Sequence, residues 1–375
     1  MPKVKLGDIA KERREVYNGD KSSCPVVGLE HLTPGEIRLS DWDVGGNNTF
    51  SKAFFAGDVL FGRRRAYLKK AAQATVDGVC SGDITVIQAR TDRVSPELLP
   101  FIIQNDAFFK FAVENSAGSL SPRVKWEHLA NYEIGLPPMN EQRKLASLLW
   151  AAYELKESYE RLLLASDEMA KSRFIEMFGK RQYPQSALIE LIEPDAGLSY
   201  GIVQPGDDGT GDMGVLRPVD LIDGRISTSA IKYVNRSIGD GYKRTELNGK
   251  EILISVRGTT GITAITDSRF AGMNVTRGIA VIRFDEKKVN AIFLNAAINE
   301  RTSQAFIQEH TRGATLKQIN LADLRRLPIF LPPLALQKEF AAFIEQLDKS
   351  KVELQKSIAC TDAMIKSLLS EAMGE

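Results

Sequence analysis

The sequence contains few of the residues that usually bind metals or form disulfides. Only three histidines occur among 375 residues, and the three cysteines are far apart and never in a Cys-x-x-Cys pair: Cys24, Cys80 and Cys360. Neither a zinc site nor a disulfide framework is therefore indicated. No run approaches the roughly 18 apolar residues of a membrane span, and the charged segment Met1 to Glu15 does not resemble a signal peptide, so we expect a cytoplasmic protein.

The short motifs of several enzyme classes are also missing. We find no GxxxxGK[ST], GxSxG or HExxH, no Asn-Pro-Pro-aromatic or Asp-Pro-Pro-Tyr block of an amino-methyltransferase, and no carboxylate pair typical of a metal nuclease. The literal GxGxxG match at 209–214 follows Asp207-Asp208 in an expected loop and opens no amphipathic helix, so we discount a dinucleotide site. We predict that the chain is not itself an enzyme.

Charge and length restrict the remaining classes. The 49 basic residues nearly cancel the 48 acidic ones, which leaves a net charge of +1, and 43% of residues are hydrophobic. This composition is typical of a globular protein, and any nucleic-acid surface must come from local clusters of charge. A chain of 375 residues exceeds the size of one hydrophobic core, so we expect two or three domains.

The second half of the sequence resembles the first. With an offset of 195 residues, Leu136-Pro137-Pro138 falls on Leu331-Pro332-Pro333, and the same register aligns Gln142 with Gln337 and Gly179 with Gly374. Upstream the offset shrinks, since Gly57 pairs with Gly249 and Leu6 with Leu188. The two repeats run over about 1 to 180 and 181 to 375, and this long match indicates an internal duplication.

Each repeat changes character at its Pro-Pro pair. Before the pair, short apolar runs between Gly, Asn and Asp clusters predict strands: 58–61, 84–87, 252–254 and 279–282. Helical patterns are interspersed, best at 96–113 and 290–308, so this part of each repeat is predicted to be a mixed α+β globule.

After each Pro-Pro pair the apolar period becomes heptad-like. In the first repeat the predicted seam comprises Leu145, Leu148, Ala152, Leu155, Tyr159, Leu162, Ser166 and Met169. In the second repeat it comprises Phe340, Phe343, Leu347, Ser350, Leu354, Ser357, Thr361 and Met364. Neither Gly nor Pro interrupts these stretches, so each predicts one helix of about 39 residues, roughly 58 Å long.

The order of these segments predicts an architecture. We assign a first globular domain to 1–138, a long helix to 139–179, a second globular domain to 180–333 and a second long helix to 334–375. The seam of the second helix needs a partner, and the first helix offers the matching surface if the two run antiparallel, which gives a pseudo-two-fold molecule. The alternative is that the heptads are core helices of two ordinary domains.

Several blocks of this chain resemble the specificity subunits of type I restriction-modification systems. The blocks are Ile134-Gly135-Leu136-Pro137-Pro138 with Gln142, Leu324 to Pro333 with Gln337, Gly313 to Leu321, Tyr200 to Gly206, and Ile252 to Gly258 leading to Asn274-Val275-Thr276-Arg277. The likeness covers essentially the whole chain. It departs from the pattern at Gly118 to Trp126, where the first repeat lacks the more typical block of the second.

The resemblance implies a function that composition alone does not. It implies two target-recognition domains, each reading one half of a split target in double-stranded DNA, and helices that separate the domains and dock two methyltransferase subunits. Restriction subunits are a further expected partner. The resemblance also implies no cofactor on this chain, with S-adenosylmethionine, ATP and Mg²⁺ on the partner subunits.

Basic clusters give the candidate DNA contacts. The strongest lies in the first repeat, where no acidic residue occurs between Asp58 and Asp77: Arg63, Arg64, Arg65, Tyr67, Lys69 and Lys70. Weaker candidates are Arg123, Lys125, Lys243, Arg244, Arg257, Arg312 and Lys317. Arginine suits both phosphate contacts and guanine edges, although such a run is also common on a solvated strand edge.

Apolar residues beside the predicted seam are candidates for partner binding: Leu149, Leu163, Ile344 and Ile358. Packing within the helix pair is the alternative for each of them. Because the helices match between the repeats while the globule loops diverge, we expect a bipartite, non-palindromic target. The helix length limits its half-site centres to about 17 base pairs apart, and roughly one turn of DNA is favoured.

Two rival functions stay open. A stand-alone DNA methyltransferase or restriction enzyme needs a cofactor loop and a catalytic motif that we do not find in the sequence. A coiled-coil scaffold without a DNA role needs only the helices.

Overall fold

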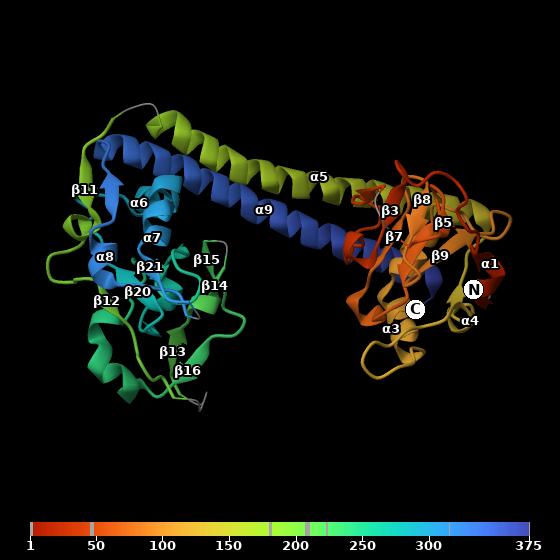
Figure 1. Cartoon of the computed structure of the whole chain (residues 1–375), viewed down its shortest axis with the longest axis horizontal. Helices are drawn as coiled ribbons and strands as arrows, with labels where there is room; N and C mark the ends of the chain where they lie inside the picture. Colours follow the sequence, from red (N-terminus) through yellow and green to blue (C-terminus); the bar gives the residue numbers. More distant parts are fainter. Residues whose placement is uncertain are drawn as a thin grey trace. The chain divides into compact units, whose positions relative to one another are not determined.

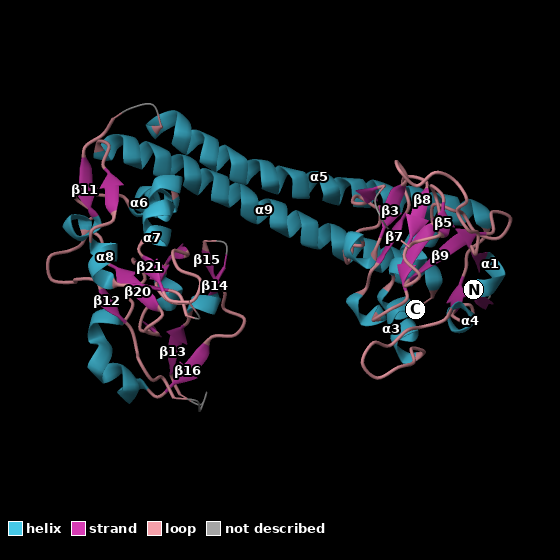
Figure 2. Cartoon of the chain, in the orientation of Figure 1, coloured by secondary structure: helices cyan, strands magenta, loops and turns pink. Residues whose placement is uncertain are grey.

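The computed structural model describes residues 3–45, 49–179, 182–206, 211–222, 224–314 and 316–374. The chain forms two compact units (Figure 1 and Figure 2). Unit 1 comprises Met1–Leu163 and Val352–Glu375, and unit 2 comprises Leu164–Lys351. Within the described part of the chain, no helix combines the length and the apolar character that a bilayer crossing requires.

Unit 1 contains two four-stranded sheets. The first is antiparallel and has the order β2 (Ala10–Glu12), β9 (Ile84–Ala89), β6 (Val59–Gly62), β7 (Ala71–Gln73). The second has the order β4 (Asp43–Val44), β3 (Pro25–Val27), β8 (Gly78–Cys80), β5 (Lys52–Phe54). A further pair joins β1 (Lys3–Lys5) to β10 (Glu133–Gly135). The α-helices of the globular part are α1 (Leu6–Ile9), α2 (Leu99–Gln104), α3 (Asp106–Glu114) and α4 (Trp126–Leu129), and two 3₁₀ turns are η1 (Leu29–His31) and η2 (Ala66–Leu68).

Unit 2 repeats this plan with different loops. Its antiparallel four-stranded sheet has the order β12 (Ser199–Tyr200), β20 (Ile279–Ile282), β17 (Ile252–Ser255), β18 (Thr263–Ile265). A three-stranded sheet has the order β16 (Lys232–Val234), β13 (Met213–Leu216), β19 (Asn274–Val275). Strand pairs are β11 (Gln185–Ala187) with β23 (Pro328–Phe330), β14 (Leu221–Ile222) with β15 (Arg225–Ile226), and β21 (Thr311–Arg312) with β22 (Gln318–Ile319). The helices are α6 (Ala291–Asn299), α7 (Arg301–Glu309) and α8 (Leu321–Arg325), with 3₁₀ segments η3 (Leu188–Leu191), η4 (Pro218–Asp220), η5 (Arg236–Thr245) and η6 (Ser268–Phe270).

The predicted helical regions 96–113 and 290–308 each form two helices rather than one. In unit 1 the chain turns at Asn105, whose backbone is extended and whose side chain accepts a hydrogen bond from the Ala107 N–H. Glu300, 195 residues later, is equally extended and caps α7 through the Thr302 N–H. A polar cap inside an apolar pattern ends one helix and begins the next, and the apolar spacing alone did not reveal this break.

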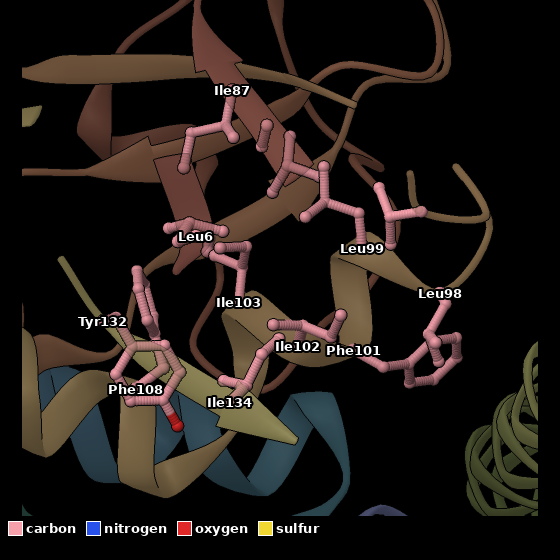
Figure 3. Packing of buried hydrophobic residues seen from close by; sticks show 14 of the residues in the cluster. Leu6, Ile87, Leu98, Leu99, Phe101, Ile102, Ile103, Phe108, Tyr132 and Ile134 are labelled. Atoms are coloured by element: carbon pink, nitrogen blue, oxygen red, sulfur yellow. The ribbon is translucent and has the colours of Figure 1, made fainter. Parts of the chain in front are cut away.

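Apolar side chains from the sheet, the helices and the β1–β10 pair form the core of unit 1. Figure 3 shows part of it, where Phe101, Ile102 and Ile103 of α2 lie near Leu6 and Ile134. All five side chains are at most 2% exposed. This cluster extends to the start of α5 and the end of α9 through Leu149 and Met373, so the long helices are part of the domain core.

The two long helices predicted from the heptads are present. They are α5 (Met139–Phe178) and α9 (Leu334–Met373), each of 40 residues and therefore about 60 Å long. A buried glutamine ties the start of each helix to its domain. The Gln142 amide accepts from Ser95 N and donates to Pro137 O at 2.9 Å each, and Gln337 makes the equivalent bonds to Asn290 N and Pro332 O.

The two helices pack together and run antiparallel, as expected. In unit 1, Lys156 Nζ of α5 lies 2.8 Å from Asp362 Oδ1 of α9. In unit 2, Lys351 Nζ of α9 lies 2.6 Å from Asp167 Oδ1 of α5. Residue numbers thus rise along one helix as they fall along the other. The predicted α+β fold with a duplicated domain and two long antiparallel helices is confirmed.

The predicted seam is wrong at four positions of α5 and at two positions of α9. In α5, Leu145, Ala152 and Ser166 are buried as expected, but four other predicted seam residues are between 44% and 57% exposed: Leu148, Leu155, Leu162 and Met169. The positions that face inward are one residue later, at Leu149, Lys156, Leu163 and Ala170. In α9 the same shift replaces the exposed Ser350 and Met364 with Lys351 and Ile365, which are partly buried.

Candidate nucleic-acid interface

The arginine run of unit 1 begins where a fully buried strand ends. All four residues of β6 are buried, and β6 lies between β9 and β7 in its sheet. The chain then leaves the sheet through Arg63, Arg64 and Arg65 and turns through η2 before it returns as β7. A buried strand followed by a short turn holds the segment 63–70 at the sheet edge. We call this segment the first arginine loop.

Arg64 and Arg123 share one carboxylate. Arg123 Nε donates to Asp83 at 2.7 Å, and Arg64 donates from Nη1 to Asp83 at 3.4 Å and from Nε to Ser121 at 2.6 Å. The hydrogen bond from Arg123 holds the pKa of Asp83 below its usual value, although partial burial acts in the opposite direction. Asp83 and Ser121 could not be recognised from the sequence as partners of Arg64, because they lie far from the arginine run along the chain.

The two lysines of the first arginine loop also have partners inside the domain. Lys69 Nζ lies 2.5 Å from Asp106, which Lys366 of α9 also contacts at 3.1 Å. Lys70 donates to the carbonyl oxygen of Leu29 at 2.6 Å. These lysines stabilise the loop in its present position, so their side chains are less available to DNA than the sequence suggested.

Arg63 and Lys125 line a second surface. Together with Trp126 and His128 they border an open cavity of about 750 Å³. Arg63 Nε is buried and has no hydrogen-bond partner among the described residues. Arg63 thus borders this cavity, whereas Arg64 and Arg123 pair with Asp83.

A short hairpin lies directly beside the first arginine loop. Ala117 and Arg123 pair across this hairpin, and the Arg65 N–H donates to Pro122 O at 2.8 Å. At its tip Leu120 is 91% exposed, while Tyr67 of the loop is 53% exposed. The segment 118–126, which departs from the family pattern, thus forms one surface with the arginine run.

Unit 2 builds the same arrangement with fewer charges. Arg257 follows β17 as Arg64 follows β6, and its Nε donates to Gln318 Oε1 at 2.5 Å. Gln318 pairs with Arg312 across the β21–β22 hairpin, and Gly258 N donates to Lys317 O at 2.9 Å. The structure therefore brings together the predicted residues Arg257, Arg312 and Lys317. Thr315 of this hairpin lies outside the described residues, as do Gly209 and Thr210 of the GxGxxG match.

Lys243 and Arg244 lie on another part of unit 2. Both are exposed in the last turn of η5, a segment that packs against β19 rather than extending from the end of β17. Arg283 fixes this turn by donating to the carbonyl oxygen of Arg244 at 3.0 Å. These two residues stay candidates for DNA contact from a second segment.

The predicted partner-binding residues occupy seam positions. Leu149 is fully buried in the core of unit 1, so the prediction that it contacts a partner is wrong. Leu163, Ile344 and Ile358 are half-buried at the equivalent positions of the two helices. The large apolar residues of α5 that are exposed are Leu148, Leu155, Leu162, Leu164, Met169 and Ile175.

Comparisons with known proteins agree with this architecture. The sequence model described as the type I restriction modification DNA specificity domain matches residues 211–359. The putative type I restriction enzyme MjaX specificity subunit of Methanocaldococcus jannaschii is 22% identical over 91% of this chain and 85% of its own length. In both comparisons the chain is similar to type I restriction specificity proteins, and the family model covers fewer than half of its residues.

Further matches cover a smaller part of the chain or concern the fold alone. The EcoBI specificity subunit of Escherichia coli is 25% identical over 51% of this chain, and the match spans only 41% of that subunit. The type I restriction-modification S subunit from M. genitalium has a TM-score of 0.59 over 99% of this chain and 96% of its own, at 12% identity. A structure reported for complex assembly and conformational transition of the type I R-M system also has a TM-score of 0.59, at 19% identity over 99% of this chain and 97% of that chain. At these identities the two structures show a shared fold.

Proposed function

We propose that this chain is the DNA-specificity subunit of a type I restriction-modification complex. Unit 1 and unit 2 each read one half of a bipartite, asymmetric target in double-stranded DNA. The observation that carries the proposal is the arginine at the same place in both repeats. Arg64 and Arg257 each follow the end of a buried strand and donate a hydrogen bond to the neighbouring hairpin, while the side chains around them differ. A shared scaffold with different loops is what two different half-sites require.

The catalytic work belongs to partner subunits in this proposal. Two methyltransferase subunits bind S-adenosylmethionine, and restriction subunits use ATP and Mg²⁺, so the specificity subunit needs no cofactor of its own. The outward apolar residues of α5, such as Leu148 and Leu155 in unit 1 and Met169 and Ile175 in unit 2, offer contact area for the methyltransferase subunits. The number of base pairs between the half-sites stays a prediction.

Methylation mapping tests the proposal directly. The chain is produced with its cognate methyltransferase subunits, the complex modifies random-sequence DNA, and methylated adenines are located by long-read sequencing. We expect one split motif whose two halves differ. Methylation without a defined motif, or with a motif that does not depend on this chain, would contradict the proposal.

Two measurements separate the rival functions. A stand-alone methyltransferase binds S-adenosylmethionine, so calorimetry with the isolated chain should give no binding heat under our proposal. A coiled-coil scaffold does not bind DNA, whereas we expect the assembled complex to bind random duplex with an affinity that falls as salt rises.

A further inference from the structure

Two residues of the first arginine loop have a left-handed backbone conformation, which is unfavourable for residues with a Cβ atom. Arg65 has φ 54° and ψ 56°, and Lys69 has φ 52° and ψ 42°. They are the only non-glycine residues with positive φ in the described part of the chain. Left-handed backbone is uncommon for residues with a Cβ, and such strain is concentrated at functional sites.

The duplicated unit shows how the same turn forms without strain. The pairs Phe61–Ala71 and Ile254–Thr263 close equivalent turns. Counting from the ends of β6 and β17 shows that Arg65 in unit 1 is equivalent to Gly258 in unit 2. The Arg65 and Gly258 N–H groups donate to equivalent carbonyl oxygens, those of Pro122 and Lys317. Counting back from β7 and β18 shows in the same way that Lys69 is equivalent to Gly261.

Unit 2 therefore uses glycine at both left-handed positions. Gly258 has φ 77° and Gly261 has φ 90°. Glycine reaches this region at no steric cost, so it suits the turn better than arginine or lysine. The arginine and the lysine at these positions of unit 1 therefore need an explanation other than backbone geometry.

Lys69 has such an explanation inside the protein, and Arg65 does not. Lys69 forms an ion pair with Asp106. The Arg65 guanidinium is exposed and has no hydrogen-bond or ion-pair partner among the described residues, in contrast to its neighbour Arg64. It lies beside the exposed Tyr67 and beside the hairpin that carries the exposed Leu120.

We propose that Arg65 is a specificity-determining residue of unit 1 and reads the major-groove edge of a guanine in its half-site. This inference rests on the proposed DNA-specificity function. A guanidinium donates two parallel hydrogen bonds to O6 and N7 of guanine, the commonest specific arginine contact with DNA. The left-handed backbone fixes the point on the turn from which the Arg65 side chain extends. Unit 2 has no side chain at this position, so its half-site is read without an equivalent of Arg65.

The variant Arg65→Gly separates strain from recognition. It reproduces the residue of the sister unit, so the midpoint of thermal unfolding should be no lower than that of the wild-type complex. Methylation mapping should show the variant accepting other bases at one position of the unit 1 half-site while the other half-site is unchanged. Arg65→Lys keeps the charge but loses the fork of two donors, so it should relax the same position.

A base substitution identifies the contact. Each guanine of the unit 1 half-site is replaced in turn by 7-deazaguanine, which lacks the N7 acceptor, and binding of the duplex to the assembled complex is measured. For the wild type we expect one guanine at which the affinity falls by about 5-fold to 150-fold. The Arg65→Gly complex should be insensitive at that guanine alone. Arg93→Ala, which removes an exposed arginine outside the loop, should behave as the wild type.

Several outcomes overturn the inference. They are an unchanged motif for Arg65→Gly, equal sensitivity of both complexes to every 7-deazaguanine, or a uniform loss of affinity with a shallower salt dependence, which indicates a phosphate contact. A lowered unfolding midpoint for Arg65→Gly also contradicts the strain on which the inference depends. Failure of the proposed function itself looks different, because the wild-type complex then has no split motif.

Discussion

Lys156 Nζ of α5 forms an ion pair with Asp362 Oδ1 of α9 at 2.8 Å, and the Lys156 side chain, at an inward-facing position of α5, is 17% exposed. The same contact recurs with both numbers moved by 195 residues, since Lys351 pairs with Asp167 at 2.6 Å and is 12% exposed. In a two-fold interface each contact occurs twice, between equivalent residues of the two surfaces. Here the two equivalent surfaces belong to one chain.

Removing one of these ion pairs should destabilise the helix pair only moderately. Because the aspartates remain substantially exposed, we expect a coupling of about 0.5–1 kcal/mol between Lys156 and Asp362 in the free energy of unfolding. A double-mutant cycle with Lys156→Met and Asp362→Asn, followed by urea unfolding of the complex, measures it. A coupling near zero would show that the pair does not help to fix the register.

The shifted seam predicts opposite results for two adjacent leucines. Leu149 is fully buried and Leu148 is 57% exposed. Leu149→Ala should lower the free energy of unfolding by about 2–5 kcal/mol, because it leaves a cavity in the core of unit 1. Leu148→Ala should change it by less than about 0.5 kcal/mol. Denaturant titration compares the two, and a larger loss for Leu148→Ala would restore the register predicted from the sequence.

The carboxylate of Asp83 predicts a pH dependence of stability. Its pKa is lowered in the folded protein, mainly by the hydrogen bond from Arg123. A group with a lowered folded pKa stabilises the fold above its unfolded pKa of about 4 and loses this effect as the pH falls through the folded value. Asp83→Asn should therefore cost about 1 kcal/mol near pH 7 and progressively less below about pH 4.

The free energy of unfolding of the wild type and of Asp83→Asn, measured over this pH range, tests the assignment. Asp77→Asn is a suitable control, since its carboxylate lies on another turn and accepts from the backbone N–H of Ala56. A difference between wild type and Asp83→Asn that is constant with pH would show that the ion pair does not contribute.

Arg257 predicts the corresponding loss in the second half-site. It extends from the end of β17 and bonds to Gln318 of the neighbouring hairpin. Arg257→Met should lower the affinity of the complex for its target by about 5-fold or more and relax only the half-site of unit 2. Arg269→Met is a matched control, because Arg269 is 74% exposed and paired with Asp267 in the same unit. Equal effects of the two substitutions would argue against a role for Arg257 in recognition.

Much of this fold could be predicted because the two halves of the chain can be aligned with each other. The register that matches Gln142 with Gln337 located both long helices, and both glutamines make equivalent buried hydrogen bonds. The seam could not be placed with the same certainty. The adjacent leucines Leu148 and Leu149 fit two heptad registers, and a rule based on hydrophobicity prefers Leu155 to Lys156. The structure buries the stem of Lys156 and pairs its charge, which only the partner helix determines.

The candidate interface was predictable in composition but not in geometry. The arginine run was visible in the sequence, whereas the partners of Arg64 and Arg123 were not, since Asp83 meets them only after the sheet has formed. The left-handed conformation of Arg65 was also hidden, because the residue type argues against it.

Methylation mapping with single substitutions in each unit tests most directly whether the two units read separate half-sites. The complexes to compare are the wild type, Arg65→Gly and Arg257→Met, each with the cognate methyltransferase subunits. We predict a split, asymmetric motif for the wild type, with relaxation confined to one half for Arg65→Gly and to the other half for Arg257→Met. A continuous or palindromic motif, or relaxation of the same half by both substitutions, would contradict the division of recognition between the units.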